Sequence, residues 1–147
     1  LFGPYLDETV ELGDKIKYFG SFKPDELPGK LEGKFGLVWD GDSIDTCSGS
    51  TGNYLRYNNP HKTSLYLTAG IPVIIWKEAA MAKFVERHKV GILVESLTEI
   101  DDVINKISES DYTELKNNAV QIGMQLRDGY YYKKALQECI ENANSNR

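Results

Sequence analysis

The chain has 147 residues, of which 41% are hydrophobic and 27% are charged, a balance typical of one globular domain with a real core. The formal net charge of −5 argues against nonspecific binding to nucleic acid or to an anionic membrane, because the long-range field would repel both. Cys47 and Cys139 form no CxxC pair, which favours reduced thiols in a cytoplasmic protein. The sequence shows no signal peptide and no apolar run long enough to cross a bilayer.

The first residues, LFGPYLDE, lack an initiator methionine and begin within a strand-like pattern, so we expect the chain to be the C-terminal part of a larger protein. Residues 16–19 (IKYF) are β-prone and are followed by Gly20, which predicts a short strand. The next segment, KPDELPGKL, carries helix-start signals at Pro24 and Asp25, which predict a helix that ends near Gly29 and Gly33.

The rest of the chain alternates apolar strands with amphipathic helices. Residues 41–58 break this pattern, because they are rich in Gly, Ser, Asp and Asn and predict a long loop. The other predicted elements, in chain order, are a strand at 35–39, a helix at about 60–69, a strand at 72–76, a helix at 78–89, a strand at 91–95, a helix at 98–107, and helix from 110 to 147 with a break near Gly129.

Strands that are apolar throughout and alternate with helices are buried on both faces. This pattern predicts an α/β fold, a doubly wound parallel sheet with helices on both faces. Such sheets bind ligands at the carboxyl ends of their strands, where loops meet helix N-termini. The candidate site therefore comprises the loops after Phe19, Trp39 and Trp76, together with the helix start at Pro60.

The strongest motif is Asn59-Pro60-His61-Lys62-Thr63, at the predicted start of a helix. The first backbone N–H groups of a helix are unpaired and carry partial positive charge, so they form an anion site. Lys62 and the hydroxyls of Thr63 and Ser64 would add donors suited to a diphosphate. The alternative is that Asn59 caps the helix and Lys62 is only solvated. His61 is either a packing residue or a phosphate donor.

Asp40-Gly41-Asp42 forms a D-x-D motif directly after an apolar strand. Such a motif could hold Mg²⁺ or Mn²⁺ against a nucleotide diphosphate. Asp and Gly are also ordinary turn residues after a strand, so this signal is weak.

The loop sequence CSGSTGNYLRYNN matches neither a Walker loop nor a dinucleotide fingerprint. Tyr54, Arg56 and Tyr57 could close over a ligand as a mobile lid, or the loop could be an inert excursion. Cys47 and the two histidines lack any accompanying oxyanion signature, so nucleophilic catalysis is set aside.

Several segments resemble one family. NNPHKTSLYLTAGIPVI resembles the P-x-K-x-x-E-Y-L-x-x-G-x-P-V-I segment in the C-terminal domain of GT-B-fold glycosyltransferases, and KIKYFGSFKPDEL resembles an earlier segment of that domain. FGLVWDG, YNNPHK and YYYKKAL look most like the bacterial glucosyltransferases that add the second sugar to serine-rich repeat adhesins, whose relatives are often labelled galactofuranosyltransferases. The resemblance covers nearly the whole chain.

The resemblance implies a Rossmann-like half that binds UDP, with the acceptor half in a separate N-terminal domain. It implies that Lys62 is the phosphate-binding and catalytic lysine, and that the loop 20–22 meets the base. Many relatives place a glutamate that holds the ribose where this sequence has Leu65, so ribose recognition must come from elsewhere. The predicted nucleotide-binding residues are Gly20, Ser21, Phe22, Asp40, Gly41, Asn59, Pro60, His61, Lys62 and Thr63.

The expected function is transfer of a hexose, glucose from UDP-glucose, to GlcNAc already attached to a serine-rich protein, with no metal or other cofactor. The expected partners are the UDP-sugar, that glycosylated acceptor protein and the protein's own N-terminal domain, and homo-oligomer formation stays open. The alternatives are a metal-dependent D-x-D sugar transferase, a non-catalytic nucleotide-binding module and, ranked last, a flavodoxin-like or receiver domain.

Overall fold

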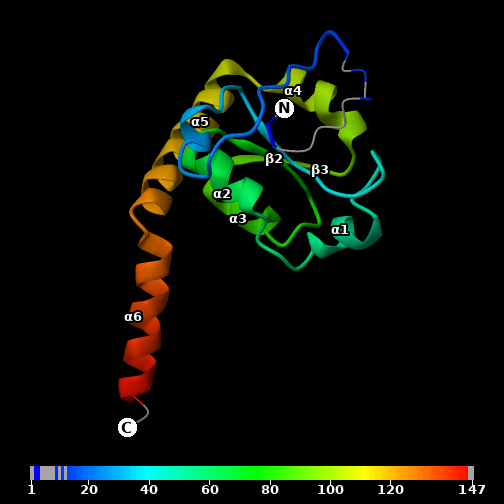
Figure 1. Ribbon diagram of the computed structural model, residues 1–147. Helices are drawn as coiled ribbons and strands as arrows, with labels where there is room; N and C mark the ends of the chain where they lie inside the picture. Colours follow the sequence, from blue (N-terminus) through cyan, green and yellow to red (C-terminus); the bar gives the residue numbers. More distant parts are fainter. Residues whose placement is uncertain (1, 4–8, 10, 12, 146–147) are drawn as a thin grey trace. The chain divides into compact units, whose positions relative to one another are not determined.

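A computed structural model describes residues 2–3, 9, 11 and 13–145, and the chain divides into two compact units, residues 1–31 and 32–147 (Figure 1). Among the helices described, none is both long and apolar enough to span a membrane.

The first unit contains little regular structure. Its described residues form only one helical element, the 3-10 helix η1 (Leu27–Gly29). The predicted helix from Pro24 onward is therefore wrong beyond this single turn, because Pro28 has no N–H to donate and Gly29 favours the end of a helix. The predicted strand at 16–19 is also wrong. Its side chains are exposed, and no strand among the described residues of this unit is available to pair with it.

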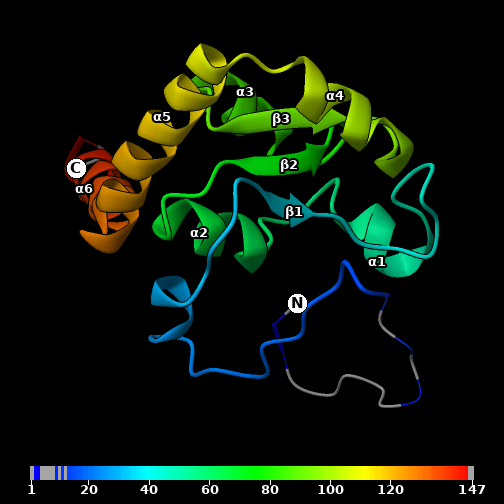
Figure 2. The same cartoon turned by 90° about the horizontal axis from the view of Figure 1, so that it is seen from above.

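The second unit is built on a parallel sheet of β1 (Gly36–Val38), β2 (Val73–Trp76) and β3 (Gly91–Val94), in that spatial order (Figure 2). These strands confirm the three apolar runs predicted at 35–39, 72–76 and 91–95. All four residues of the central strand β2 are buried, as expected for a strand covered on both faces. The α/β class and the parallel sheet are confirmed, whereas the wider doubly wound arrangement and the GT-B assignment stay predictions.

The helices follow the predicted order with two differences. The segment before α3 is a turn, so this helix starts four residues after the predicted start, Glu78. The predicted loop 41–58 contains a short helix, α1. The break near Gly129 is confirmed, and this glycine has a positive φ of 67°. The helical elements are α1 (Gly49–Tyr54), α2 (His61–Thr68), α3 (Ala82–His88), η2 (Leu97–Glu99), α4 (Ile100–Lys106), α5 (Glu109–Arg127) and α6 (Tyr130–Ser145).

The two ends of the sheet lie next to different helices, α1 at one end and α5 at the other (Figure 2). Helix α1 lies beyond the carboxyl end of β1, and its Gly52 approaches that strand end so closely that a Cβ would lie 2.9 Å from the Asp40 carbonyl oxygen. Helix α5 lies across the opposite end and packs against α2. There a Cβ on Gly123 would lie only 2.3 Å from the carbonyl oxygen of Leu67, which is buried in the core. This close contact fixes the C-terminal part of α2.

We predict that Gly123→Ala destabilises the protein by about 1–3 kcal/mol, because the added methyl group must push α5 away from the backbone of α2. Urea unfolding followed by circular dichroism measures this change. Gly29→Ala is the matched control, because a Cβ there meets no atom within 4 Å. Equal stability of Gly123→Ala and the wild type would contradict the close packing of α2 on α5.

Candidate functional site

The carboxyl end of β1 brings Asp40 to the edge of the sheet. The Trp39 indole N–H donates a hydrogen bond to the carbonyl of Ser43 at 3.0 Å, which folds the following loop back on the strand. Gly41 has a φ of 106°, and a Cβ on it would lie 2.3 Å from the Ser48 carbonyl oxygen. Only glycine fits this tight turn, which holds the Asp40 carboxylate at the strand end.

The N-terminus of α2 faces the same edge without a side-chain cap. Pro60 occupies the N-cap position with extended backbone angles (φ −67°, ψ 134°), and no side chain accepts a hydrogen bond from the first turn. The alternative in which Asn59 caps the helix is therefore wrong, because the helix starts one residue too late for it. The first turn also contains no acidic residue, and His61 and Lys62 are both exposed. The N–H groups of His61 and Lys62 and the partial positive charge of the helix end remain available to an anion, whereas the Thr63 N–H donates to the Pro60 carbonyl.

Lys62 contacts the end of β1. Its Nζ lies 2.9 Å from Oδ1 of Asp40 and donates a second, longer hydrogen bond of 3.4 Å to the Trp39 carbonyl. The Lys62 side chain is 48% exposed and that of Asp40 is 37% exposed, so solvent weakens their attraction. The contact shows that an anionic oxygen fits against this ammonium group, and that the pair can open at little cost.

A cavity of about 500 Å³ surrounds this ion pair. This volume lies in the range of sites that bind drug-sized ligands. The carbonyl oxygen of the Asn58 side chain is buried and has no hydrogen-bond partner among the described residues. The lining residues are Asp40, Tyr54, Asn58, Asn59, Pro60, His61 and Lys62.

Arg56 anchors one wall of this cavity. Its guanidinium forms an ion pair with Glu78 and lies over the Trp76 ring, 4.6 Å from the ring centroid. Beside it, the Ala80 N–H donates to the carbonyl of the fully buried Leu55 at 2.8 Å. These contacts tie residues 49–58 to the loop after β2, which supports a braced wall more than a mobile lid.

The remaining predicted residues lie elsewhere. The Thr63 side chain is buried and lines a different cavity, while its N–H donates to the Pro60 carbonyl at 3.0 Å. The predicted loop at 20–22 belongs to the first unit, so its role at this cavity stays a prediction. In the part of the chain described, no group of three or more His, Cys, Asp or Glu side chains is arranged to hold a metal ion.

Cys47 packs close to Asp40 but is 2% exposed. Burial raises the pKa of the Cys47 thiol, a change that a backbone hydrogen bond at Asp40 partly opposes. A raised pKa lowers the thiolate fraction at neutral pH, so this cysteine is a core residue rather than a nucleophile.

Asn58 was missed as a cavity residue, and Tyr54 and Arg56 were considered only as part of a lid. The signal available in the sequence was their position in the loop just before the Pro60 helix start. Their roles depend on how that loop folds back over β2, which the local pattern does not encode.

Comparison with known proteins decides the family. The profile described as "Glucosyltransferase 3-like, C-terminal domain" matches residues 1–139. The chain belongs to this family. It is 42% identical over 139 residues to the beta-1,6-galactofuranosyltransferase WbbI of Escherichia coli (strain K12), a match that covers 91% of the chain and 41% of that protein.

Two further members of the comparison are each named Glucosyltransferase 3. The chain is 27% identical over 141 residues to that of Streptococcus gordonii and 28% identical over 141 residues to that of Streptococcus parasanguinis. Each match covers 95% of the chain, and 41% and 40% of the two proteins respectively. The chain thus spans about two fifths of the length of the curated relatives it matches.

We predict that Lys62→Ala and Asp40→Asn each change the free energy of unfolding by less than about 1 kcal/mol, because their ion pair is exposed. Leu55→Ala is the control that shows the sensitivity of the urea titration, with an expected loss of about 2–5 kcal/mol for a fully buried leucine. A loss above about 2 kcal/mol for Lys62→Ala would show that the pair is structural.

Proposed function

We propose that this chain is the donor-binding part of a glycosyltransferase, and that the diphosphate of a UDP-sugar binds at the start of α2. One observation carries the proposal. The Lys62 ammonium lies 2.9 Å from an anionic oxygen, at an uncapped helix N-terminus, within a cavity of about 500 Å³. Membership of a family whose named relatives are glycosyltransferases supports the same conclusion.

In the proposed binding, a diphosphate replaces the Asp40 carboxylate as the anion that contacts Lys62. A diphosphate carries more negative charge than the single carboxylate of Asp40, and it can also accept from the N–H groups of His61 and Lys62 at the helix start. Because the ion pair is exposed and weak, Lys62 can exchange its carboxylate partner for a phosphate oxygen.

The same groups would assist the reaction. When the bond between the sugar and the β-phosphate breaks, its electron pair stays on the phosphate oxygen, where negative charge develops. The Lys62 ammonium and the N-terminus of α2 would stabilise that charge from positions fixed before the reaction starts, which is preorganised electrostatic catalysis.

Ribose recognition needs groups that accept hydrogen bonds from the ribose hydroxyls. Leu65 has no such group, so other residues must supply them. We place this role on the Asp40 carboxylate, which lines the same cavity as Lys62. The loop 20–22 is proposed to contact the base through its backbone, as the family resemblance implies.

The donor is proposed to be a UDP-hexose, with glucose transferred to GlcNAc on a serine-rich protein and the acceptor bound by the protein's own N-terminal domain. Galactofuranose is the second candidate sugar, because the identity of 42% to a galactofuranosyltransferase exceeds the 27% and 28% to the two proteins named Glucosyltransferase 3. Displacement of bound UDP by UDP-glucose and by UDP-galactofuranose, compared in the full-length protein, separates these donors.

We propose that no metal ion takes part. Lys62 and the start of α2 supply the positive charge that a metal would otherwise bring to the diphosphate. If UDP binding disappeared on adding EDTA and returned with Mg²⁺ or Mn²⁺, the metal-dependent alternative would hold instead. A full-length protein that binds UDP-sugars but transfers none to GlcNAc-bearing acceptors would be a non-catalytic module.

We predict that Lys62→Ala weakens UDP binding by roughly 1.5–3 kcal/mol, the usual loss for a hydrogen bond to a charged group. Isothermal titration calorimetry of UDP into both proteins measures this difference. Pyrophosphate should lose a similar amount, whereas uridine, which has no phosphate, should bind both proteins equally.

The matched control is Lys134→Ala on α6, which removes the same charge from an exposed position outside the cavity. It should leave UDP affinity unchanged, apart from a small effect that added salt removes. Equal losses in the two variants would mean that only net charge matters, and an unchanged affinity for Lys62→Ala would refute the phosphate role of Lys62.

A further inference from the structure

Tyr54, the last residue of α1, lines the cavity around Lys62. It is 61% exposed, so a large part of its ring is in contact with water. An aromatic ring carries much apolar surface, and covering that surface releases water and favours binding. A ligand that extends from Lys62 over this ring would therefore gain affinity from it.

The main chain on both sides of Tyr54 is held in place. The next residue, Leu55, is fully buried, and its carbonyl accepts a hydrogen bond of 2.8 Å from the Ala80 N–H. The Tyr54 carbonyl accepts from the N–H groups of Tyr57 and Asn58 at 3.0 Å and 3.1 Å, which closes the turn after α1. Because the backbone is already ordered, a ligand that covers the ring restricts only the rotation of this side chain.

A UDP-sugar has four parts, and the proposed function places three of them. The diphosphate lies at the start of α2, the ribose at Asp40 and the base at the loop 20–22. The hexose is bonded directly to the β-phosphate, so it must occupy space that continues from Lys62. Three other residues of the cavity wall can meet it there, namely Tyr54, Asn59 and His61.

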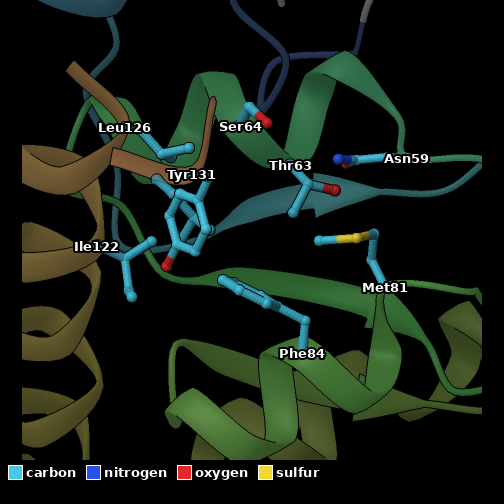
Figure 3. Close-up of a pocket in the computed structure, with 9 residues that line it drawn as sticks. Asn59, Thr63, Ser64, Met81, Phe84, Ile122, Leu126 and Tyr131 are labelled. Atoms are coloured by element: carbon cyan, nitrogen blue, oxygen red, sulfur yellow. The ribbon is translucent and has the colours of Figure 1, made fainter. Parts of the chain in front are cut away.

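A second cavity also borders the start of α2. It has a volume of about 270 Å³, lies between α2, α3, α5 and α6, and shares Asn59 with the first cavity (Figure 3). Away from Asn59 its walls are formed mainly by apolar side chains, among them Phe84, Ile122 and Leu126. Hydroxyl groups buried against such walls lose their hydrogen bonds to water, so this cavity suits a sugar poorly.

The cavity around Lys62 has the composition that a hexose needs. Tyr54 supplies an apolar ring face, while Asn59 and His61 supply amide and imidazole groups that form hydrogen bonds with hydroxyls. A hexose combines C–H groups, which form an apolar surface, with hydroxyl groups that require polar partners. An aromatic wall with a few polar groups is the usual composition of a small-molecule site.

We propose that Tyr54 contacts the transferred sugar, with the hexose against the tyrosine ring and the diphosphate at Lys62. This inference rests on the proposed UDP-sugar function and assigns the position of the sugar within the same cavity. Tyr54 is then a specificity-determining residue. It strengthens the binding of the UDP-sugar and leaves the binding of UDP, which lacks the hexose, unaffected.

The contribution of Tyr54 is measured as a ratio, the dissociation constant of the UDP-sugar divided by that of UDP. Isothermal titration calorimetry gives both constants. UDP-glucose and UDP-galactofuranose are each titrated, and the donor that the wild type binds more tightly is used. We predict that Tyr54→Ala raises the ratio roughly 5-fold to 50-fold, as expected when about 40–90 Å² of apolar surface is no longer buried. The affinity for UDP should stay unchanged.

Two control variants separate the ring from other effects. Tyr54→Phe keeps the ring and should keep a ratio close to that of the wild type. Tyr57→Ala removes a ring that is 80% exposed in the same segment and is not among the residues that line the cavity. It should change neither dissociation constant. Tyr54→Ala should also unfold at the same urea concentration as the wild type, because the ring that it removes is exposed.

Two outcomes would overturn this assignment. An unchanged ratio in Tyr54→Ala would show that the ring does not contact the sugar, and equal losses of UDP and UDP-sugar affinity would place the ring against the nucleotide. The proposed function is tested separately by Lys62→Ala, which should weaken UDP and the UDP-sugar alike and leave the ratio unchanged. Failure of the Lys62 role and failure of the Tyr54 role are therefore distinguished by different measurements.

Discussion

The placement of α2 is the constraint on which the rest of this structure depends. Its C-terminal part is fixed by the close approach of Gly123 in α5 to the Leu67 carbonyl. With that end held, the uncapped N-terminus must face the carboxyl end of β1, where Lys62 meets Asp40. The dipole of α2, the Lys62 ammonium and the carboxyl end of β1 thus meet without a Walker loop or a dinucleotide fingerprint. One end of this eight-residue helix is fixed by packing, and the other end is the proposed anion site.

The first turn of α2 also separates two chemically different spaces. On one side, exposed charged groups surround a cavity suited to a diphosphate. On the other, the buried Thr63 side chain lines a cavity together with aromatic and aliphatic side chains. Adjacent residues of a helix point in directions about 100° apart, so neighbouring positions can serve unrelated environments. This geometry explains why a motif first interpreted as one phosphate-binding unit divides between two cavities.

The sequence was informative where a local pattern determines the structure. Apolar runs predicted the three strands, and the Pro60 turn predicted the start of α2, where Lys62 lines a cavity. It was not informative where the structure depends on distant partners. The segment 16–19 has strand-forming residues but no neighbouring strand among those described, and α1 forms in a glycine-rich loop because Gly52 fits against the Asp40 carbonyl. The contact of Arg56 with Glu78 and Trp76 joins two loops, which no local pattern reveals.

The central claim is that Lys62 exchanges the Asp40 carboxylate for a phosphate oxygen. A crystal structure of the protein with UDP tests it most directly. The account predicts a phosphate oxygen about 2.7–2.9 Å from the Lys62 Nζ, with further oxygens at the N–H groups of the first turn of α2. UDP bound elsewhere, with Lys62 still paired to Asp40, would contradict it.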